Sequence, residues 1–422
     1  MNSNVRIIAS IALIGLAIWG FMLVSGEQQE TPKVVDSSLP DIPENSVGGK
    51  LTLKASAECA ECHAEIYKEW KGSQHEFAWL NPEPRRKELS NNFRNKDCIP
   101  CHAPRPLLEV GFGDRALERE TRREEGVNCF TCHRFNDVVV GPNDMGAGAA
   151  LAPCKPVKWA PVSRVMLCTP CHDQHKVEQD WLGSRFADKE GGEYQDCNDC
   201  HMPVLDGPGT IGGARPTHRG HGFKGGHDPA ILKTAGIVRA KRFDSSEEIS
   251  QVVAELTSRK WQAKAQVSLD RGILIEVKNT GTGHNFPSDE RHRAVDLYAR
   301  FVPEKGKPTE EVRLVRFRNP YRHEFEKVNP FKDKPGVALT APLPWAGAEL
   351  QLTQVRILPE FNPTRKVFYP ESTQLHAGES RLLWFDFPEW GKGTLQLRLY
   401  YKLQPFLGND AAVEVSSFDL SF

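Results

Sequence analysis

The sequence predicts an α+β protein of several domains: a mainly α, loop-rich domain followed by an all-β antiparallel sandwich, with a signal-anchor helix before both. Three observations lead to this prediction. An uncharged apolar run covers residues 7–24, a cysteine and histidine motif recurs between residues 59 and 201, and apolar and polar residues alternate beyond about residue 241. With 422 residues, the chain also exceeds the roughly 250–300 residues at which one hydrophobic core stops growing.

The N-terminus carries one positive charge, at Arg6, before the apolar run of residues 7–24. This run is longer than the apolar core of an ordinary signal peptide, about 7–15 residues, and close to the roughly 20 residues that span a bilayer. We expect a signal anchor that tethers a periplasmic or outward-facing body to the inner membrane, although Val24-Ser25-Gly26 also fits a cleavage site. The leader therefore covers residues 1–26, and a proline-rich flexible linker covers residues 27–57.

The pattern Cys-x-x-Cys-His occurs five times in the next part of the chain. Two thiols three positions apart on one turn can each bond a vinyl group of a haem, and the histidine that follows can bind the iron. A zinc ribbon, a redox dithiol and a disulfide framework are the competing interpretations, but the histidine follows the second cysteine in every copy. We therefore predict five covalently bound haem c groups. The attachment residues are Cys59, Cys62, Cys98, Cys101, Cys129, Cys132, Cys168, Cys171, Cys197 and Cys200, and the proximal ligands are His63, His102, His133, His172 and His201.

The expected pentahaem cytochrome c domain covers residues 58–230. Its five motifs share 143 residues, too few to give each one an ordinary side-chain core, so the porphyrins themselves must form most of the interior. Crowded porphyrins lie close together, as electron transfer between them requires. Helices are expected at 65–70 and 114–125.

One cysteine, Cys154, is left outside the motifs, because ten of the eleven belong to them. No disulfide framework within the chain is therefore available. A spare loop thiol is the default interpretation of Cys154, and a ligand or reactive role is the alternative.

Nine histidines lie outside the motifs, more than five irons need as sixth ligands. Methionine is a poor alternative, because few methionines lie outside the leader. Mostly bis-histidine ligation with low reduction potentials is therefore expected. The distal candidates are His75, His175, His218, His221, His227 and His284.

Beyond a connecting segment at residues 231–260, with a helix expected at 247–256, the chain is expected to form a β-sandwich over residues 261–422. Short runs with a period of two, separated by Gly, Pro and Asn, indicate antiparallel strands. The expected strands are 265–269, 273–277, 294–302, 312–317, 381–387, 394–401 and 412–418.

The residues around the first motif resemble the hydroxylamine-oxidoreductase-related multihaem cytochromes, a group that includes the tetrahaem electron acceptors of ammonia oxidation. The likeness rests on Cys59 to Ala64, on Trp70, Ser73 and His75, on the loop 217–229 and on the turn 279–287. The resemblance implies that His75 is a distal ligand to another haem. Five haems and a sandwich depart from the smallest family members, so the pairing of ligands is not carried over.

An exported electron carrier, with redox proteins as its donor and acceptor, is the first functional hypothesis. A haem-dependent oxidoreductase of small nitrogen or sulfur compounds, with one iron open to substrate, is the second. A membrane quinol dehydrogenase and a β-domain that mediates an oligomer or complex are further alternatives. Since the net charge is −1, nucleic-acid binding is not expected.

Overall fold

A computed structural model provides the structure of the protein. It describes residues 50–79, 99–110, 115–144, 147–163, 165–173, 176–244, 272–288, 293–319, 352–355, 373–386 and 391–422. The expected anchor at 7–24, most of the linker, Cys98, His175 and the elements expected at 247–256 and 265–269 lie outside these ranges. Among the described residues, no helix combines the length and apolar character needed to cross a membrane.

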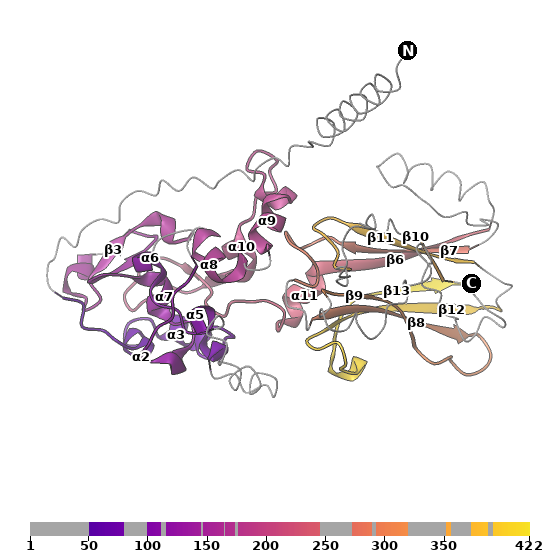
Figure 1. Ribbon diagram of the computed structural model, residues 1–422, viewed down its shortest axis with the longest axis horizontal. Coiled ribbons are helices and arrows are strands. Elements are labelled where there is room, and N and C mark those ends of the chain that lie inside the picture. The colour runs from indigo at the N-terminus through magenta and orange to yellow at the C-terminus, as the bar shows by residue number, and fades with distance from the viewer. Residues whose placement is uncertain are drawn as a thin grey trace, which may run out of the picture. The chain divides into compact units, whose positions relative to one another are not determined.

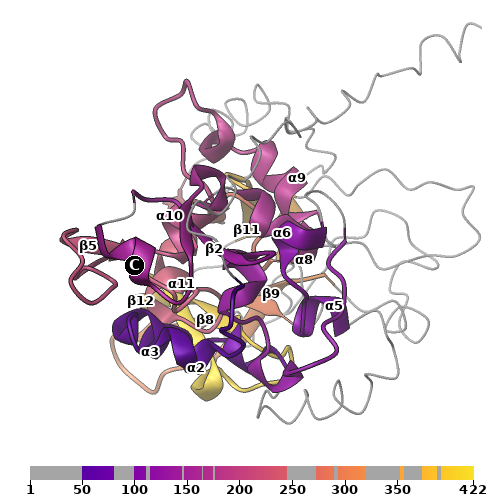
Figure 2. The same ribbon diagram turned by 90° about the vertical axis from the view of Figure 1, so that its left-hand side faces the viewer.

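Short helices dominate the chain up to residue 235 (Figures 1 and 2). The α-helices are α2 (Ser56–Cys59), α3 (Ala64–Trp70), α5 (Ile99–His102), α6 (Leu107–Val110), α7 (Cys129–His133), α8 (Thr169–His172), α9 (Val177–Leu182), α10 (Cys197–His201) and α11 (Pro229–Ala235). The 3-10 turns are η1 (Glu76–Ala78), η2 (Arg123–Glu125), η3 (Ala147–Leu151), η4 (Ala160–Ser163), η5 (Val165–Leu167) and η7 (Arg185–Ala187). Each of the five motifs overlaps one short α-helix.

The helix expected at 65–70 is confirmed by α3, but the helix expected at 114–125 is wrong over the described residues 115–122. There the chain runs extended past Pro104, and only η2 is helical. The Arg119 guanidinium explains the difference, because it donates to the carbonyls of Pro104 (2.9 Å) and Gly126 (2.8 Å). Its charge satisfies a loop backbone instead of forming pairs along a helix.

Two small sheets accompany these helices. One has the order β1-β2-β3, from β1 (Arg134–Phe135), β2 (Val138–Gly141) and β3 (Pro156–Lys158). The other is a hairpin of β4 (Val204–Asp206) and β5 (Thr217–Arg219). The first sheet places the Val140 carbonyl beside His133, and the loop of the hairpin places the Gly209 carbonyl beside His63.

The C-terminal part contains two four-stranded sheets, with the orders β10-β11-β7-β6 and β13-β12-β8-β9 (Figure 1). All neighbouring strands in both sheets are antiparallel. The strands are β6 (Gly236–Phe243), β7 (Gly272–Asn279), β8 (Ala294–Pro303), β9 (Val312–Phe317), β10 (Leu352–Val355), β11 (Ser380–Asp386), β12 (Gly393–Lys402) and β13 (Val413–Ser421). The 3-10 turn η8 (Asn409–Ala411) lies between β12 and β13 in the sequence.

The six strands expected within the described residues are present, each close to its expected position. The segment expected as a connection, 231–260, differs from expectation: its first half forms most of α11 and the edge strand β6. β6 pairs with β7 along its full length, so this stretch belongs to the first sheet.

Alternate side chains of both sheets meet in one apolar core. Ile275 of β7 and Leu297 and Leu397 of the second sheet are fully buried in it. A backbone hydrogen bond from Val238 to the Ser416 hydroxyl (3.1 Å) joins β6 to β13 of the second sheet. Two antiparallel sheets that enclose one core are the elements from which a β-sandwich is built.

A charged network is buried on the β8-β12 pair. The Asp296 carboxylate is fully buried and accepts two hydrogen bonds of 2.7 Å from Arg316. The ammonium of Lys402, only 2% exposed, lies 3.4 Å from it. Such a pair is costly to break, because the remaining charge stays buried without its partner.

Replacing Asp296 by Asn should therefore lower the free energy of unfolding of the β-part by about 3–5 kcal/mol, measured by urea denaturation. Asp419→Asn is the matched control, because Asp419 pairs with Arg398 on the surface, with its side chain 48% exposed. An exposed pair contributes at most about 1 kcal/mol. Equal losses in the two variants would contradict this prediction.

Candidate haem sites

Three histidines of the Cys-x-x-Cys-His motifs each face a second imidazole across the same distance. His75 faces His172, His221 faces His133, and His284 faces His201. In all three pairs the ring centres are 6.2 Å apart. A metal–imidazole nitrogen bond is about 2 Å long, so two such bonds together with the half-widths of the two rings fill this distance. The residues present therefore fit one iron between each pair of rings.

The facing histidines are in the protonation state that a metal ligand requires. Burial lowers the pKa of His75 to about 3 and those of His221 and His284 to about 4. Burial also lowers the pKa of His133, on the proximal side. At neutral pH these imidazoles are uncharged, and the neutral ring is the form that binds metal ions.

Backbone carbonyls fix the orientation of most of these rings through Nδ1, which leaves Nε2 for a metal. The Nδ1 groups of His63, His102 and His133 donate to the carbonyls of Gly209 (2.8 Å), Ala78 (2.6 Å) and Val140 (2.8 Å). Those of His201, His221 and His284 donate to the carbonyls of Lys224, Arg219 and Asn285. Such a hydrogen bond sets the tautomer and raises the basicity of a ligating histidine. No pattern in the sequence marks these carbonyls.

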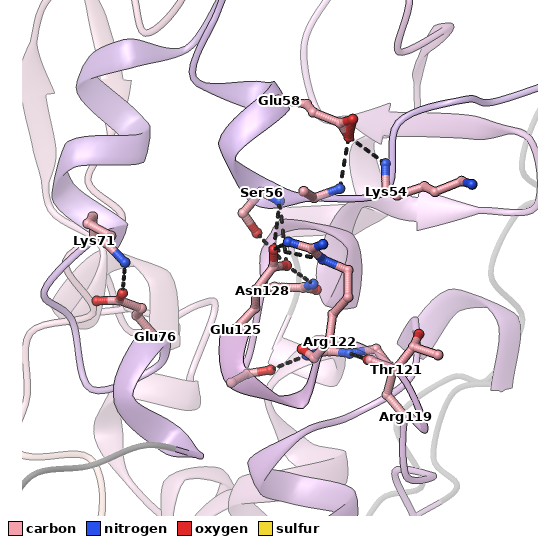
Figure 3. Close-up of polar contacts among 12 residues, drawn as sticks. Lys54, Ser56, Glu58, Lys71, Glu76, Arg119, Thr121, Arg122, Glu125 and Asn128 are labelled. Atoms are coloured by element: carbon pink, nitrogen blue, oxygen red, sulfur yellow. Dashed lines mark hydrogen bonds and ion pairs between the residues drawn. The ribbon is translucent and has the colours of Figure 1, made fainter.

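His75 is presented by a tight turn after α3. Trp70 is buried and donates from its indole to the Val127 carbonyl (2.9 Å), which fixes the end of the helix. Glu76 then closes the turn, because its carboxylate accepts from the Gly72 backbone (2.8 Å) and pairs with Lys71 (Figure 3). The Val127 amide donates to the His75 carbonyl (2.9 Å). The Trp70, Ser73 and His75 pattern thus marks a turn held from both sides.

Gly126 allows the chain to pass close behind His75. Its φ of 57° is in the left-handed region, and a Cβ there would overlap the carbonyl oxygens of His75 and Glu76. Gly126→Ala should therefore displace His75 and convert part of one low-spin haem to high-spin, measured by electron paramagnetic resonance. Gly212→Ala is the control, because Gly212 also has a positive φ (69°) but a Cβ there meets open space. Similar spectra for the two variants would contradict the prediction.

A buried carboxylate joins the first motif to the third. Glu125 accepts hydrogen bonds from the Ser56 hydroxyl (3.2 Å), from Asn128 (2.7 Å) and from Arg122 (Figure 3). Asn128 in turn caps α7, since its side chain accepts from the Thr131 amide (3.1 Å). These hydrogen bonds, of which the one from Arg122 lowers the pKa most, hold the pKa of Glu125 below its usual value against the effect of burial. Glu125 therefore fixes the starts of α2 and α7 relative to each other.

His284 lies on the loop that follows β7 and reaches the helical part of the chain that carries the five motifs. A Cβ on Gly283 would lie 2.8 Å from the Trp181 ring, so only glycine fits this passage. Arg185 donates to the Thr280 carbonyl (3.0 Å). The Asn279 amide donates to the His284 carbonyl (2.9 Å), which closes the loop. A side chain from the β-part is thereby placed opposite His201.

The remaining distal candidates are placed differently. His218 uses both ring nitrogens, one toward the Glu69 carboxylate (2.8 Å) and one toward the Gly207 carbonyl (3.0 Å), so neither is left for a metal. The Nε2 of His227 lies 3.3 Å from the Arg293 guanidinium. His175 is outside the described residues. Glu69, which also accepts from the His221 amide (2.8 Å), was not singled out from the sequence, where no spacing marks it.

Cysteines of different motifs lie near one another. Cys129 raises the pKa of the Cys59 thiol, Cys101 that of Cys171, and Cys168 that of Cys197. The first motif therefore adjoins the third, and the fourth adjoins both the second and the fifth. Cys154 is partly buried, and burial raises the pKa of its thiol.

Comparisons with known proteins also indicate a c-type cytochrome. Residues 58–134 match the family model described as cytochrome c554 and c-prime. Among solved structures, the chain is similar to a penta-heme cytochrome c552 from Thermochromatium tepidum, with 17% sequence identity and a TM-score of 0.54. The match covers 89% of this chain and 100% of that one. A search of curated proteins gave no match.

The motifs, the facing imidazoles and the family match together support a multihaem c-type cytochrome with covalently bound haem. At this level of description, electron transfer is the corresponding activity. The similar solved structure is that of a penta-heme cytochrome, with which this chain shares its fold.

Proposed function

We propose that the chain is an exported electron carrier that holds five mostly bis-histidine haems and connects redox proteins of a respiratory chain. The observation that carries this proposal is the common 6.2 Å spacing of the three imidazole pairs. Bound haems supply one-electron chemistry, and the protein anchors, orients and shields them. The proposal places the body in the periplasm or outside the cell, with residues 7–24 as its anchor.

The proximity of the motifs to one another supports electron transfer from haem to haem. The neighbouring cysteines link the first motif to the third, and the fourth to the second and the fifth. His75, which follows the first motif, lies opposite His172 of the fourth, so these two regions share one site. Cys132 of the third motif also raises the pKa of Cys171, so the third and fourth motifs lie near each other as well. We infer an order of motifs 1, 3, 4 and 5, with motif 2 beside motif 4 and with the segment after the first motif reaching across to the fourth through His75. A membership in the hydroxylamine-oxidoreductase-related group is part of the proposal.

Three measurements on protein matured in an export-competent host test the proposal. A pyridine haemochrome assay should return five haems per chain, and electron paramagnetic resonance should show mainly low-spin iron. A redox titration should then give mostly low midpoint potentials, as expected without thioether ligands. Clearly fewer than five haems, or zinc in their place, would overturn the proposal.

A haem-dependent oxidoreductase of small nitrogen or sulfur compounds is the second candidate. One observation favours it: within the described part of the chain, no aromatic ring faces His63 as His75 faces His172. An iron held there by His63 alone would have a free coordination position. Spectral shifts on addition of cyanide or nitrite would favour this function, and unchanged low-spin spectra would count against it.

A further inference from the structure

Cys62 marks a place where haem attachment reaches the surface. Among the described motif cysteines, Cys62 is exposed and all the others are partly buried. The first motif is also at one end of the inferred order of motifs. A haem that lies at the end of this order and is reached from solvent can pass electrons to another protein.

An apolar side chain is fixed beside this opening. The Ile211 amide donates to the Cys62 carbonyl (2.8 Å), and the neighbouring Gly209 carbonyl accepts from His63 (2.8 Å). Both residues belong to the loop of the β4-β5 hairpin, and the Ile211 side chain is 73% exposed. One backbone hydrogen bond and one from the His63 side chain therefore hold the loop, with its exposed apolar residue, against the first motif. Apolar residues at the centre of a contact and polar residues at its rim are the usual composition of a protein interface.

Acidic residues flank the same opening. Glu61 precedes Cys62 directly and Glu65 follows it in α3, and both are exposed. Neither forms an ion pair within the described part of the chain, so their charges face solvent and any partner. Lys68 is the exposed cation of residues 61–68, and the hairpin loop that carries Ile211 has one exposed cation, Arg215, and one exposed anion at its start, Asp206. Together with Glu61 and Glu65, these exposed side chains leave an excess of one negative charge. We define the motif-1 face as Glu61, Cys62, Glu65 and Ile211.

We propose that the motif-1 face docks a basic redox protein, to which the chain delivers electrons. This inference rests on the proposed electron carriage and adds the exit and the charge of the acceptor. In the transfer, the chain is oxidised by one electron and the ferric iron of the acceptor becomes ferrous. No bond is made or broken and no proton is required. Complementary charge accelerates such encounters by roughly 10- to 1,000-fold, and salt reduces the effect.

The test mixes the prereduced full chain with ferric mitochondrial-type cytochrome c, a basic protein, in a stopped-flow instrument. Glu61→Lys/Glu65→Lys should lower the second-order rate constant at low salt about tenfold and flatten its salt dependence. Glu304→Lys/Glu310→Lys is the control, because it exchanges two exposed glutamates of the β-part. Each double variant changes the net charge by the same amount, from −1 to +3.

A second pair of variants tests the apolar contact separately from charge. Ile211→Asp should lower the rate constant severalfold even at high salt, whereas Phe406→Asp should not, although Phe406 is equally exposed at 75%. Equal rates for the test and control variants of both pairs would overturn the inference. So would loss of self-association in sedimentation, if Glu61→Lys/Glu65→Lys caused it without changing the rate.

Failure of this inference is distinguishable from failure of the proposed function. If the chain holds five low-spin haems and reduces the acceptor at a rate that the variants leave unchanged, only the motif-1 face is wrong. If the haem count itself is low, the electron carrier is wrong as well.

Discussion

His284→Ala should convert one of the low-spin haems of the oxidised protein to high-spin, measured by electron paramagnetic resonance. His284 is the imidazole opposite His201, with ring centres 6.2 Å apart. Without it, the fifth motif keeps its proximal ligand and both of its attachment cysteines. The number of haems per chain should therefore stay the same while the spin state of one changes.

His376→Ala is the matched control for this variant. His376 is also a histidine of the β-part, and its Nδ1 lies 2.6 Å from the Asn285 side chain of the same loop. Its removal loosens the loop but deletes no imidazole that faces a motif histidine. The spin state of every haem should therefore remain as in the parent protein. A high-spin signal of the same size in His376→Ala would show that loop disorder, and not ligand loss, causes the change. An unchanged spectrum in His284→Ala would exclude His284 as a ligand.

The strands were predictable from the sequence because each buries alternate residues. Segments such as 273–277 and 394–401 place every second side chain in one apolar core, and this local pattern is visible without the fold. The segment 114–125 misled the prediction for the opposite reason. Its Arg and Glu spacing is typical of a helix, but Arg119 binds carbonyls that belong to other parts of the chain.

The motifs were equally predictable, because attachment and proximal ligation lie within five consecutive residues. The distal side was predictable only as a set of six candidates, which includes the three facing imidazoles, since each of these comes from a distant segment. His218 and His221 look alike in the sequence, three residues apart in one glycine-rich loop. Only the fold shows that Glu69 and Gly207 engage both nitrogens of His218, whereas His221 keeps Nε2 available beside His133.

His75→Ala is the second variant for which we expect a large effect. It removes the imidazole opposite His172, at the fourth motif, and should produce one high-spin haem. The fourth motif also adjoins the second and fifth motifs through Cys171 and Cys168. A change at the haem of the fourth motif should therefore slow the equilibration of electrons among all five haems, measured after rapid partial reduction. His284→Ala, at the end of the inferred order, should slow only the exchange with the fifth motif.

His218→Ala is the control that separates ligand loss from damage to the histidine-rich loop. His218 is as buried as a ligand, at 7% exposure, but hydrogen bonds occupy both of its nitrogens. Its loss leaves the Glu69 carboxylate without one donor, which destabilises the loop by about 1–3 kcal/mol but leaves every facing pair of imidazoles in place. If His218→Ala gave a high-spin haem and His75→Ala did not, the assignment of distal ligands would be reversed. A single high-spin signal in His75→Ala alone would instead show that His75, from the segment after the first motif, binds the iron of the fourth.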